Sequence, residues 1–249
     1  MADDTLAALI FDVDGTIAET EDAHRLAFNR AFADFGLGWV WSVPQYQTLL
    51  LTTGGKERIR AHAAAIGFDG RLDVDALHAR KTEIYKEYIL SGLARSRPGV
   101  EPLIRAAHAA GIALAIATTT SRANLDVLFE NSFGAELRSW FHVTVCGEDV
   151  DRKKPDPAVY RIALEQLAIP ARRAVAIEDS RAGVLAARGA GIENVLVTPS
   201  LYTGDHDFAG AKVILTNLAS YFSYRETGSA FAPDALPAPM AALLRKCCG

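Results

Sequence analysis

The sequence predicts an α/β protein in which a doubly wound parallel sheet carries an inserted all-helical cap domain. Three observations predict this fold class: short apolar runs, helical patterns between the later runs, and a long stretch without a convincing strand after the first run. The chain has 249 residues, of which 50% are hydrophobic and 22% are charged, so a packed core is expected. Strands that alternate with helices are typical of a parallel sheet.

Five short apolar runs are predicted to be buried parallel strands, because runs of this length without polar alternation suit strands that are covered on both faces. They are residues 9–11, 113–117, 143–146, 174–177 and 195–197. Ligands bind at the carboxyl ends of the strands in open sheets of this kind. The residues that directly follow each run are therefore the first candidates for a functional site.

Helices between the later strands are predicted from their terminal signals. Asp156 and Pro157 stand as the N-cap and the first residue of one helix, and apolar residues follow at helical spacing. Ser180 caps a second helix, which Gly191 ends. A third helix is predicted between residues 99 and 111. These helices connect consecutive strands, as a doubly wound sheet requires.

The alternation is broken once, between residues 18 and 90. The helical patterns there are residues 24–35, 56–66 and 74–89. An insertion after the first strand lies over the carboxyl ends of the strands. We therefore predict a helical cap over residues 18–90, a discontinuous core of residues 1–17 and 91–226, and a C-terminal tail of residues 227–249.

Composition excludes several classes of protein. The net charge is −4 and no Lys/Arg-rich run occurs, which argues against nucleic acid as a partner. The acidic residues 1–4 lack the basic region of a secretory signal, and no apolar stretch reaches the roughly 20 residues that cross a membrane. The three cysteines are Cys146, Cys247 and Cys248, with the last two interpreted as an exposed, oxidisable pair. We expect a cytoplasmic monomer that acts on a small molecule.

Asp12 and Asp14 directly follow the first predicted strand. Residues spaced i and i+2 in a strand point the same way, so both carboxylates can face one reacting group. Acids of like charge converge there only if a cation holds them. The simplest interpretation is a magnesium site with one carboxylate placed to attack phosphorus. Taken alone, the motif also fits an ordinary turn.

Three further strand ends carry complementary groups. Thr118 and Thr119 offer a hydroxyl and backbone amides that suit a phosphate oxygen. Lys154 can neutralise both a phosphate and an attacking carboxylate. Glu178 and Asp179 could complete an oxygen shell for Mg²⁺. Each group also has an ordinary interpretation as a turn, a solvated lysine or a helix cap, but four such strand ends in order indicate one site.

In this order the residues resemble the haloacid dehalogenase-like superfamily. The matching pieces are Asp12-Val13-Asp14-Gly15-Thr16, Thr118, Lys154 with Pro155, and Glu178-Asp179-Ser180. The resemblance implies that Asp12 is a nucleophile that forms an aspartyl-phosphate, and that Asp14 is the general acid/base. Dehalogenases of the superfamily lack an acid at the place of Asp14, so its presence implies a phosphatase or a phosphomutase.

The same resemblance implies the remaining roles in the core. Thr118 and Lys154 would bind the transferring phosphoryl group. The Asp12 carboxylate, the Asp14 carbonyl and Asp179 would hold Mg²⁺. Glu178 would contact the ion directly or through water. The cofactor implied is Mg²⁺.

The predicted cap carries a narrower resemblance, to CbbY-type sugar-bisphosphate phosphatases. The matching segments are residues 19–29 and residues 53–58. That family implies a pentulose bisphosphate as substrate, notably xylulose 1,5-bisphosphate, a misfire product that inhibits Rubisco. Carbohydrate metabolism linked to the Calvin cycle is implied by this resemblance alone.

Residues of the second segment are predicted to bind substrate. Gly54 and Gly55 precede a helix and expose amide groups, and Lys56 and Arg58 add positive charge, which suits a second phosphate. Thr53 begins the same segment. The ordinary alternative for the two cations is a solvated helix face.

Two residues of the first segment are also predicted to contact substrate. Glu19 lies near the hinge, where a sugar hydroxyl can reach it, and His24 is either a substrate contact or a hydrogen-bonded interior histidine. The leading prediction is a Mg²⁺-dependent phosphatase of a sugar bisphosphate. The alternatives are a β-phosphoglucomutase-type phosphomutase, a phosphoglycolate phosphatase and a non-catalytic phosphosugar sensor. The intact acid pair argues against the sensor, because binding alone does not need Asp14.

Overall fold

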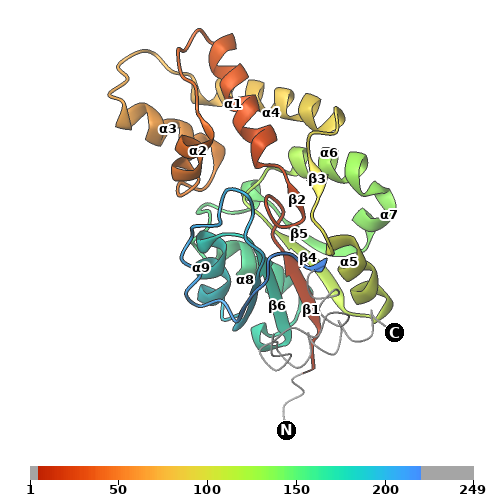
Figure 1. The fold of residues 1–249 in the computed structure, drawn as a ribbon. Coiled ribbons are helices and arrows are strands. Elements are labelled where there is room, and N and C mark those ends of the chain that lie inside the picture. The colour runs from red at the N-terminus through yellow and green to blue at the C-terminus, as the bar shows by residue number, and fades with distance from the viewer. Residues whose placement is uncertain (1–4, 220–249) are drawn as a thin grey trace.

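A computed structural model describes residues 5–219 and contains a six-stranded sheet (Figure 1). The spatial order of the strands is β5-β4-β1-β6-β7-β8, and every neighbouring pair is parallel. The strands are β1 (Ala8–Phe11), β4 (Ala113–Ala117), β5 (Phe141–Val145), β6 (Ala174–Glu178), β7 (Asn194–Val197) and β8 (Val213–Ile214). The predicted fold class is confirmed.

All five predicted strands are present, with differences at the edges of the sheet. β5 begins two residues before the predicted run, because this edge strand alternates buried Phe141 and Val143 with exposed His142. An alternating strand does not give a continuous apolar run. The two-residue β8 was not predicted, since Val213 and Ile214 are too short a pattern to distinguish from a loop.

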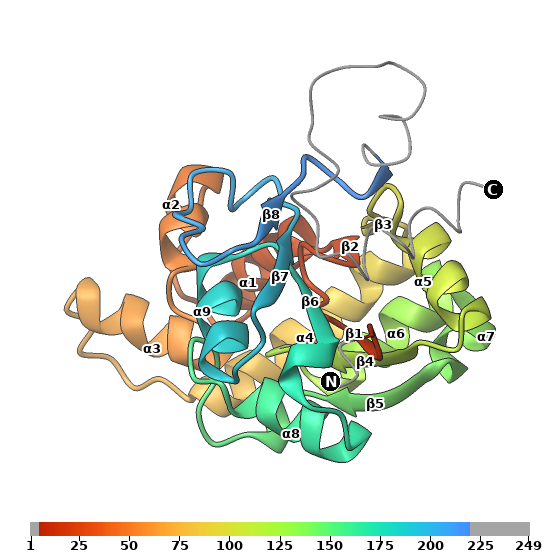
Figure 2. The ribbon, with the colours of Figure 1, turned by 90° about the horizontal axis from the view of Figure 1, so that it is seen from below.

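Helices cover both faces of the sheet, because alternate residues of each strand enter two separate cores. Leu9 and Phe11 face one core, while Ala8 and Ile10 face the other. The helices are α5 (Val100–Ala109), α6 (Arg122–Ser132) and α7 (Gly134–Ser139) on the first side, and α8 (Ala158–Leu167) and α9 (Arg181–Gly189) on the second. Figure 2 shows α8 and α9 across the sheet from α5. Two short 3-10 helices are Gly147–Asp149 and Ala171–Arg173.

The predicted helix termini are close to those observed. Ser180 is the N-cap of α9, and its hydroxyl accepts a hydrogen bond from the Gly183 backbone amide at 3.2 Å. α8 begins one residue later than predicted: Pro157 is the N-cap, and the Asp156 carboxylate accepts from the Ala158 amide at 3.0 Å. Asp156 therefore still stabilises the helix entrance, from one position further out.

Four helices lie between β1 and α5 in the chain, and Figure 1 shows them beyond the carboxyl ends of the strands. They are α1 (Glu21–Asp34), α2 (Val43–Leu49), α3 (Gly55–Ala65) and α4 (Val74–Leu90). Three of them match the predicted helical segments. α2 was missed because seven residues are too few to establish a period, although Ser42 caps it and Pro44 stands in its first turn. These four helices are called the cap below.

A two-stranded antiparallel ribbon connects the cap to the core. It pairs β2 (Ala18–Glu19) with β3 (Arg95–Ser96). The prediction that residues 18–90 contain no strand was therefore wrong at β2, whose two residues form a strand only through their partner. The domain boundaries at residues 18 and 90 remain predictions.

The predicted tail, residues 227–249, lies outside the described residues, and so do Cys247 and Cys248. Cys146 is a buried free thiol. Within residues 5–219 no helix combines the length and the apolar character needed to cross a membrane.

Candidate active site

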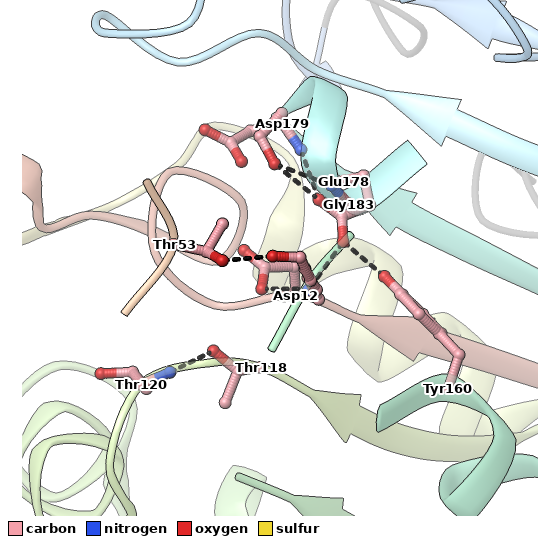
Figure 3. A network of polar contacts seen from close by, with 10 residues as sticks. Asp12, Thr53, Thr118, Thr120, Tyr160, Glu178, Asp179 and Gly183 are labelled. Carbon is pink, nitrogen blue, oxygen red and sulfur yellow. Dashed lines mark hydrogen bonds and ion pairs between the residues drawn. The ribbon is translucent and has the colours of Figure 1, made fainter. Parts of the chain in front are cut away.

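The groups predicted at separate strand ends come together because three strands are neighbours. β1 lies between β4 and β6 in the sheet, so Asp12, Thr118 and Glu178 follow or end adjacent strands. Figure 3 shows these three residues around one space, with Asp179 beside Glu178. Asp12 is only 7% exposed and Glu178 is fully buried. Buried carboxylates of this kind need charged or hydrogen-bonding partners.

Lys154 is the partner of two of these carboxylates. Its ammonium lies 2.7 Å from Asp12 Oδ1 and 2.7 Å from Glu178 Oε1. The Tyr160 hydroxyl donates to the same Glu178 oxygen at 2.5 Å. Burial opposes the charge on Lys154, but the two acids outweigh burial and raise the pKa of Lys154, so it remains an ammonium ion.

Three carboxylates form a cluster with oxygen-ligand geometry. Asp12, Glu178 and Asp179 each offer an oxygen atom within 4.8 Å of the others, and all three are buried. Burial and repulsion from neighbouring acids raise the pKa of Asp12 to about 7 and the pKa of Asp179 well above its usual value. One lysine does not balance three acids, and carboxylate oxygens are the ligands that Mg²⁺ prefers. These residues therefore fit the predicted cation.

Gly15 lets the loop after β1 approach this cluster. Its φ is +78°, a conformation that favours glycine. A Cβ atom at this position would lie 2.2 Å from Asp179 Oδ2 and 3.0 Å from the Ser200 Cβ. A side chain here would displace a carboxylate of the cluster, so the site itself requires the glycine of the motif.

The Asp14 carboxylate points away from the cluster, toward the cap. Its Oδ1 accepts from the Thr20 hydroxyl at 2.5 Å and lies 3.2 Å from His24 Nε2. Burial raises the pKa of Asp14, but His24 and the Thr20 hydrogen bond outweigh burial and hold the pKa below its usual value. Asp14 is thus ionised. The assignment of its main-chain carbonyl to Mg²⁺ stays a prediction.

His24 is an interior histidine held by a lysine, and it lies on the cavity wall. Its Nδ1 is 2.5 Å from Lys81 Nζ, and its ring stacks on Tyr85 with the centroids 4.1 Å apart. Burial lowers the pKa of His24 and lowers the pKa of Lys81 to about 7. If Lys81 donates to Nδ1, the Nε2 hydrogen of His24 donates to Asp14. A chain of hydrogen bonds therefore runs from Lys81 on α4 through His24 on α1 to Asp14.

A cavity of about 840 Å³ lies between the cap and the strand ends, within the size range of small-molecule sites. Of the predicted substrate-binding residues, those on its wall are His24, Thr53, Gly54, Gly55, Lys56, Arg58, Thr119 and Lys154. Asp12, Asp14 and Asp179 also line it. The cavity thus joins the predicted phosphate-handling residues to the predicted cap residues.

Thr118 is placed at the end of β4 but is 1% exposed and does not line the cavity. Its hydroxyl accepts a hydrogen bond from the Thr120 backbone amide at 3.2 Å (Figure 3). Thr119 and Thr120 form the wall beside it. The hydroxyl therefore shapes the turn that presents these residues.

The segment that begins with Thr53 bridges the cap and the core. The Thr53 hydroxyl donates to the Lys154 carbonyl oxygen, and Lys153 forms an ion pair with Glu57 at 3.1 Å. Gly54 has a φ of +89°, and a Cβ atom there would lie 2.7 Å from Lys153 Cδ of the core and 2.1 Å from Glu57 Oε2, so both side chains would have to move. The glycine permits the close approach of the two segments.

The predicted cations of the cap differ in what they contact. Lys56 forms an exposed ion pair with Asp75 at 2.5 Å, which water and ligands can replace. Arg58 is buried, and its guanidinium donates to the Leu49 carbonyl at 3.1 Å and to the Tyr46 hydroxyl at 2.9 Å. Arg58 lies on the cavity wall, but its hydrogen bonds join α2 and α3 within the cap.

Glu19 is not on the cavity wall. Its carboxylate pairs with Arg97 Nε at 2.9 Å, beside the β2–β3 ribbon. Burial raises the pKa of Glu19 against the opposing effect of Arg97. The structure thus places Glu19 at the connection between the cap and the core, away from the predicted sugar contact.

Thr20, Lys81 and Tyr160 are among the polar residues of the site that were not predicted from the sequence. For Lys81 a signal existed, because it stands between Leu77 and Tyr85 at helical spacing on the buried face of α4. A lysine on an apolar stripe is rarely buried unless it has a partner. For Thr20 and Tyr160 the contacts depend on how elements pack, which no local pattern gives.

A model of the haloacid dehalogenase-like hydrolase family matches residues 6–191 of the chain. The chain is also similar to the protein CbbY of Rhodobacter capsulatus, with 49% identity over 217 residues, which cover 86% of this chain and 95% of that protein. The match to the family model includes every strand from β1 to β6, and with them the residues of the carboxylate cluster.

Two solved structures are similar in both fold and sequence. The crystal structure of CbbY from Rhodobacter sphaeroides in complex with phosphate matches with a TM-score of 0.81 and 44% identity, covering 86% of this chain and 96% of that one. A mutant of CbbY from Rhodobacter sphaeroides in complex with xylulose-(1,5)bisphosphate matches with a TM-score of 0.82 and 43% identity, covering 87% and 96%.

Proposed function

The chain belongs to the haloacid dehalogenase-like hydrolase family and is a phosphatase, and we propose that it hydrolyses xylulose 1,5-bisphosphate with the help of Mg²⁺. The match to the family model and the similarity to CbbY confirm the resemblance inferred from the motifs. One observation carries the proposal: Asp12, Lys154 and Asp179 line a cavity of about 840 Å³, large enough for a small phosphorylated sugar. The similarity to a CbbY structure that holds xylulose-(1,5)bisphosphate supports the substrate.

Asp12 is the nucleophile in this proposal. Its carboxylate attacks phosphorus, the bond to the leaving oxygen breaks, and an aspartyl-phosphate forms. Lys154, 2.7 Å from Asp12, neutralises charge as the phosphoryl group arrives. Thr118 and Thr119 supply the turn that receives the phosphoryl oxygens. When bound by Asp12, Glu178 and Asp179, Mg²⁺ would supply positive charge that these residues alone lack.

Asp14 is the acid/base group in this proposal. It protonates the leaving oxygen and later takes a proton from the water that hydrolyses the aspartyl-phosphate. The low pKa of Asp14 suits the second step, because the base form is the resting form. We infer that the proton for the first step comes along the hydrogen bonds from Lys81 through His24.

The second phosphate is proposed to bind at the cap, near Lys56 and the backbone of Gly54 and Gly55. All three line the cavity, and the exposed ion pair of Lys56 with Asp75 can exchange for a ligand. A phosphate held there would use binding energy to position the reacting end of the sugar.

A panel of substrates tests the proposal. Phosphate release is measured with Mg²⁺ from xylulose 1,5-bisphosphate, ribulose 1,5-bisphosphate, glucose 1,6-bisphosphate and phosphoglycolate. The proposal predicts the highest kcat/KM for the first. A preference for phosphoglycolate would contradict the substrate but keep the phosphatase. An isomerised monophosphate without free phosphate would contradict the hydrolytic function and indicate a mutase.

We further propose that the protein is a cytoplasmic monomer that takes a small phosphorylated sugar and neither nucleic acid nor membrane. The net charge of −4 and the low number of cysteines, three in 249 residues, support this. Light scattering of the purified chain tests the oligomeric state: a mass of twice the monomer would contradict it.

A further inference from the structure

The loop after β7 touches both the carboxylate cluster and the cap. This loop comprises residues 199–203 and is called the 199–203 loop. Figure 2 shows the segment that follows β7 passing beside α2, one of the cap helices. Contacts on three sides of the loop fix its position, and each side belongs to a different part of the site.

The first side of the loop holds Asp179. Thr203 Oγ1 donates to Asp179 Oδ2 at 3.3 Å, and the Ser200 hydroxyl hydrogen-bonds the same carboxylate. The two hydroxyls are also 2.9 Å apart, and the Ser200 amide donates to Thr203 Oγ1 at 2.9 Å. Both residues are buried. The orientation of one carboxylate of the cluster therefore depends on the loop.

The second side of the loop holds the cap through Tyr202, which is 6% exposed. Its hydroxyl donates to Asp22 Oδ1 and accepts from Arg25 Nε at 3.2 Å. Its ring packs edge-on against Tyr46, with the ring centroids 5.6 Å apart. Asp22 and Arg25 belong to α1, the helix whose His24 bonds to Asp14.

The third side of the loop rests on the connection between cap and core. Arg97 Nη2 donates to the Pro199 carbonyl at 2.7 Å, and Arg97 Nε pairs with Glu19 of the β2–β3 ribbon at 2.9 Å. The ribbon and the loop are thus fixed to each other by one buried guanidinium. A displacement of α1 therefore either moves the loop through the Tyr202 contacts or breaks those contacts.

We propose that Tyr202 is a positioning residue through which the 199–203 loop couples the docking of α1 to the geometry of the cation cluster. With Tyr202 bonded to α1, Thr203 and Ser200 keep Asp179 oriented, and His24 stays on Asp14. Docking of α1 and binding of the cation then both stabilise this orientation of Asp179. The inference rests on the proposed role of the cluster in binding Mg²⁺.

Tyr202→Phe tests the coupling, because it removes one hydroxyl and keeps the ring against Tyr46. Tyr88→Phe is the matched control, since Tyr88 is a half-buried tyrosine of α4 that does not line the cavity. The readout is the rise in melting temperature of the substrate-free protein with Mg²⁺ concentration, which gives an apparent dissociation constant. This readout does not depend on any substrate.

The expected result is an apparent Mg²⁺ dissociation constant about threefold or more higher in Tyr202→Phe than in wild type, because residues of one hydrogen-bond network couple measurably. Tyr88→Phe is expected to equal wild type. In an Asp22→Ala background the Tyr202→Phe change is expected to have a smaller effect than in wild type, since the acceptor of the hydroxyl is gone and the 3.2 Å hydrogen bond from Arg25 remains. Thr203→Val is expected to weaken Mg²⁺ binding directly.

Two results would overturn the inference, and they differ in what else they affect. If Tyr202→Phe binds Mg²⁺ as tightly as Tyr88→Phe, the coupling is wrong while the proposed phosphatase site stands. If Mg²⁺ does not raise the melting temperature of wild type at any concentration, the cation role of the cluster fails, and the coupling fails with it.

Discussion

The Lys154 ammonium lies 2.7 Å from Asp12 Oδ1, although 142 positions separate the two residues in the chain. The same ammonium reaches Glu178 at 2.7 Å, so one buried cation balances the ends of β1 and β6. A buried ion pair is weak evidence for stability, because desolvation offsets the attraction. Such a pair at the base of a cavity is better explained by chemistry than by folding.

Replacing Lys154 by Met tests this relationship. The variant leaves Asp12 and Glu178 without their buried cation, so kcat is expected to fall at least about a hundredfold, and the free energy of unfolding by about 3 kcal/mol without Mg²⁺. Steady-state kinetics and urea denaturation measure the two effects. Lys153→Met is the control, since Lys153 pairs with half-exposed Glu57, and equal losses in both variants would contradict the assignment.

Gly15→Ala separates backbone strain from the carboxylate cluster. The φ of Gly15 is +78° and an added Cβ would lie 2.2 Å from Asp179 Oδ2, whereas Gly36 has a φ of +68° and nothing within 4 Å. Gly36→Ala is therefore the control, and both Gly15→Ala and Gly36→Ala are expected to cost about 1–2 kcal/mol of stability. Only Gly15→Ala is expected to lose most of its activity and its stabilisation by Mg²⁺. Full activity in that variant would show that the close approach to Asp179 is unimportant.

Lys56→Ala is expected to discriminate between substrates. It removes a cation from the cap side of the cavity, so kcat/KM should fall about tenfold for a bisphosphate, within the range of a charged hydrogen bond, and change little for a small monophosphate. Arg60→Ala, on the exposed face of the same helix and off the cavity wall, serves as the control. An equal loss on both substrates would argue against the second-phosphate role.

Lys81→Met is expected to lower activity and to raise stability. Lys81 is 3% exposed, and burial lowers its pKa from 10.5 to about 7. The unfolded chain therefore binds the extra proton between these pH values, so stability rises with pH from about 7 to about 10.5 and is lost on acidification. The variant lacks this dependence. Comparing the unfolding free energies of both proteins at pH 7 and pH 10, roughly the two ends of this window, measures it.

The activity of Lys81→Met gives the other half of that test. The hydrogen bond from Lys81 Nζ to His24 Nδ1 is lost, and with it the proposed proton supply to Asp14. A decrease in kcat of about ten- to a hundredfold is expected, in the range of general acid–base effects. Unchanged kcat with the pH-dependent stability difference intact would leave Lys81 a structural residue and contradict the relay.

The core elements were predictable because their signals are local. Apolar runs locate β1, β4, β6 and β7, and caps such as Ser180 locate helices. Elements that depend on a partner were not predictable: β2 and β3 have two residues each, and only their pairing makes them strands. The prediction missed the first two residues of β5, because an edge strand alternates in polarity.

The residues of the site also fall into a group that local signals predict and a group that depends on packing. Asp12 and Asp179 directly follow the neighbouring strands β1 and β6, and the topology of a parallel sheet is enough to bring them together. Lys154 also depends on the path of the segment after β5, which carries it past β4 to Asp12. The partners of Asp14 come from α1 and α4, and their meeting depends on how two cap helices cross. Glu19 shows the limit most clearly, because nothing in its neighbourhood in the sequence indicates Arg97 as its partner.

In the proposed mechanism Asp12 carries the phosphoryl group. Wild-type protein is mixed with xylulose 1,5-bisphosphate and Mg²⁺, quenched with acid during turnover, digested and examined by mass spectrometry, with Asp12→Asn as the blank. We expect one phosphoryl group on the peptide that contains Asp12, and none in the blank. Phosphate release by wild type without that modification, or release that persists in Asp12→Asn, would contradict it.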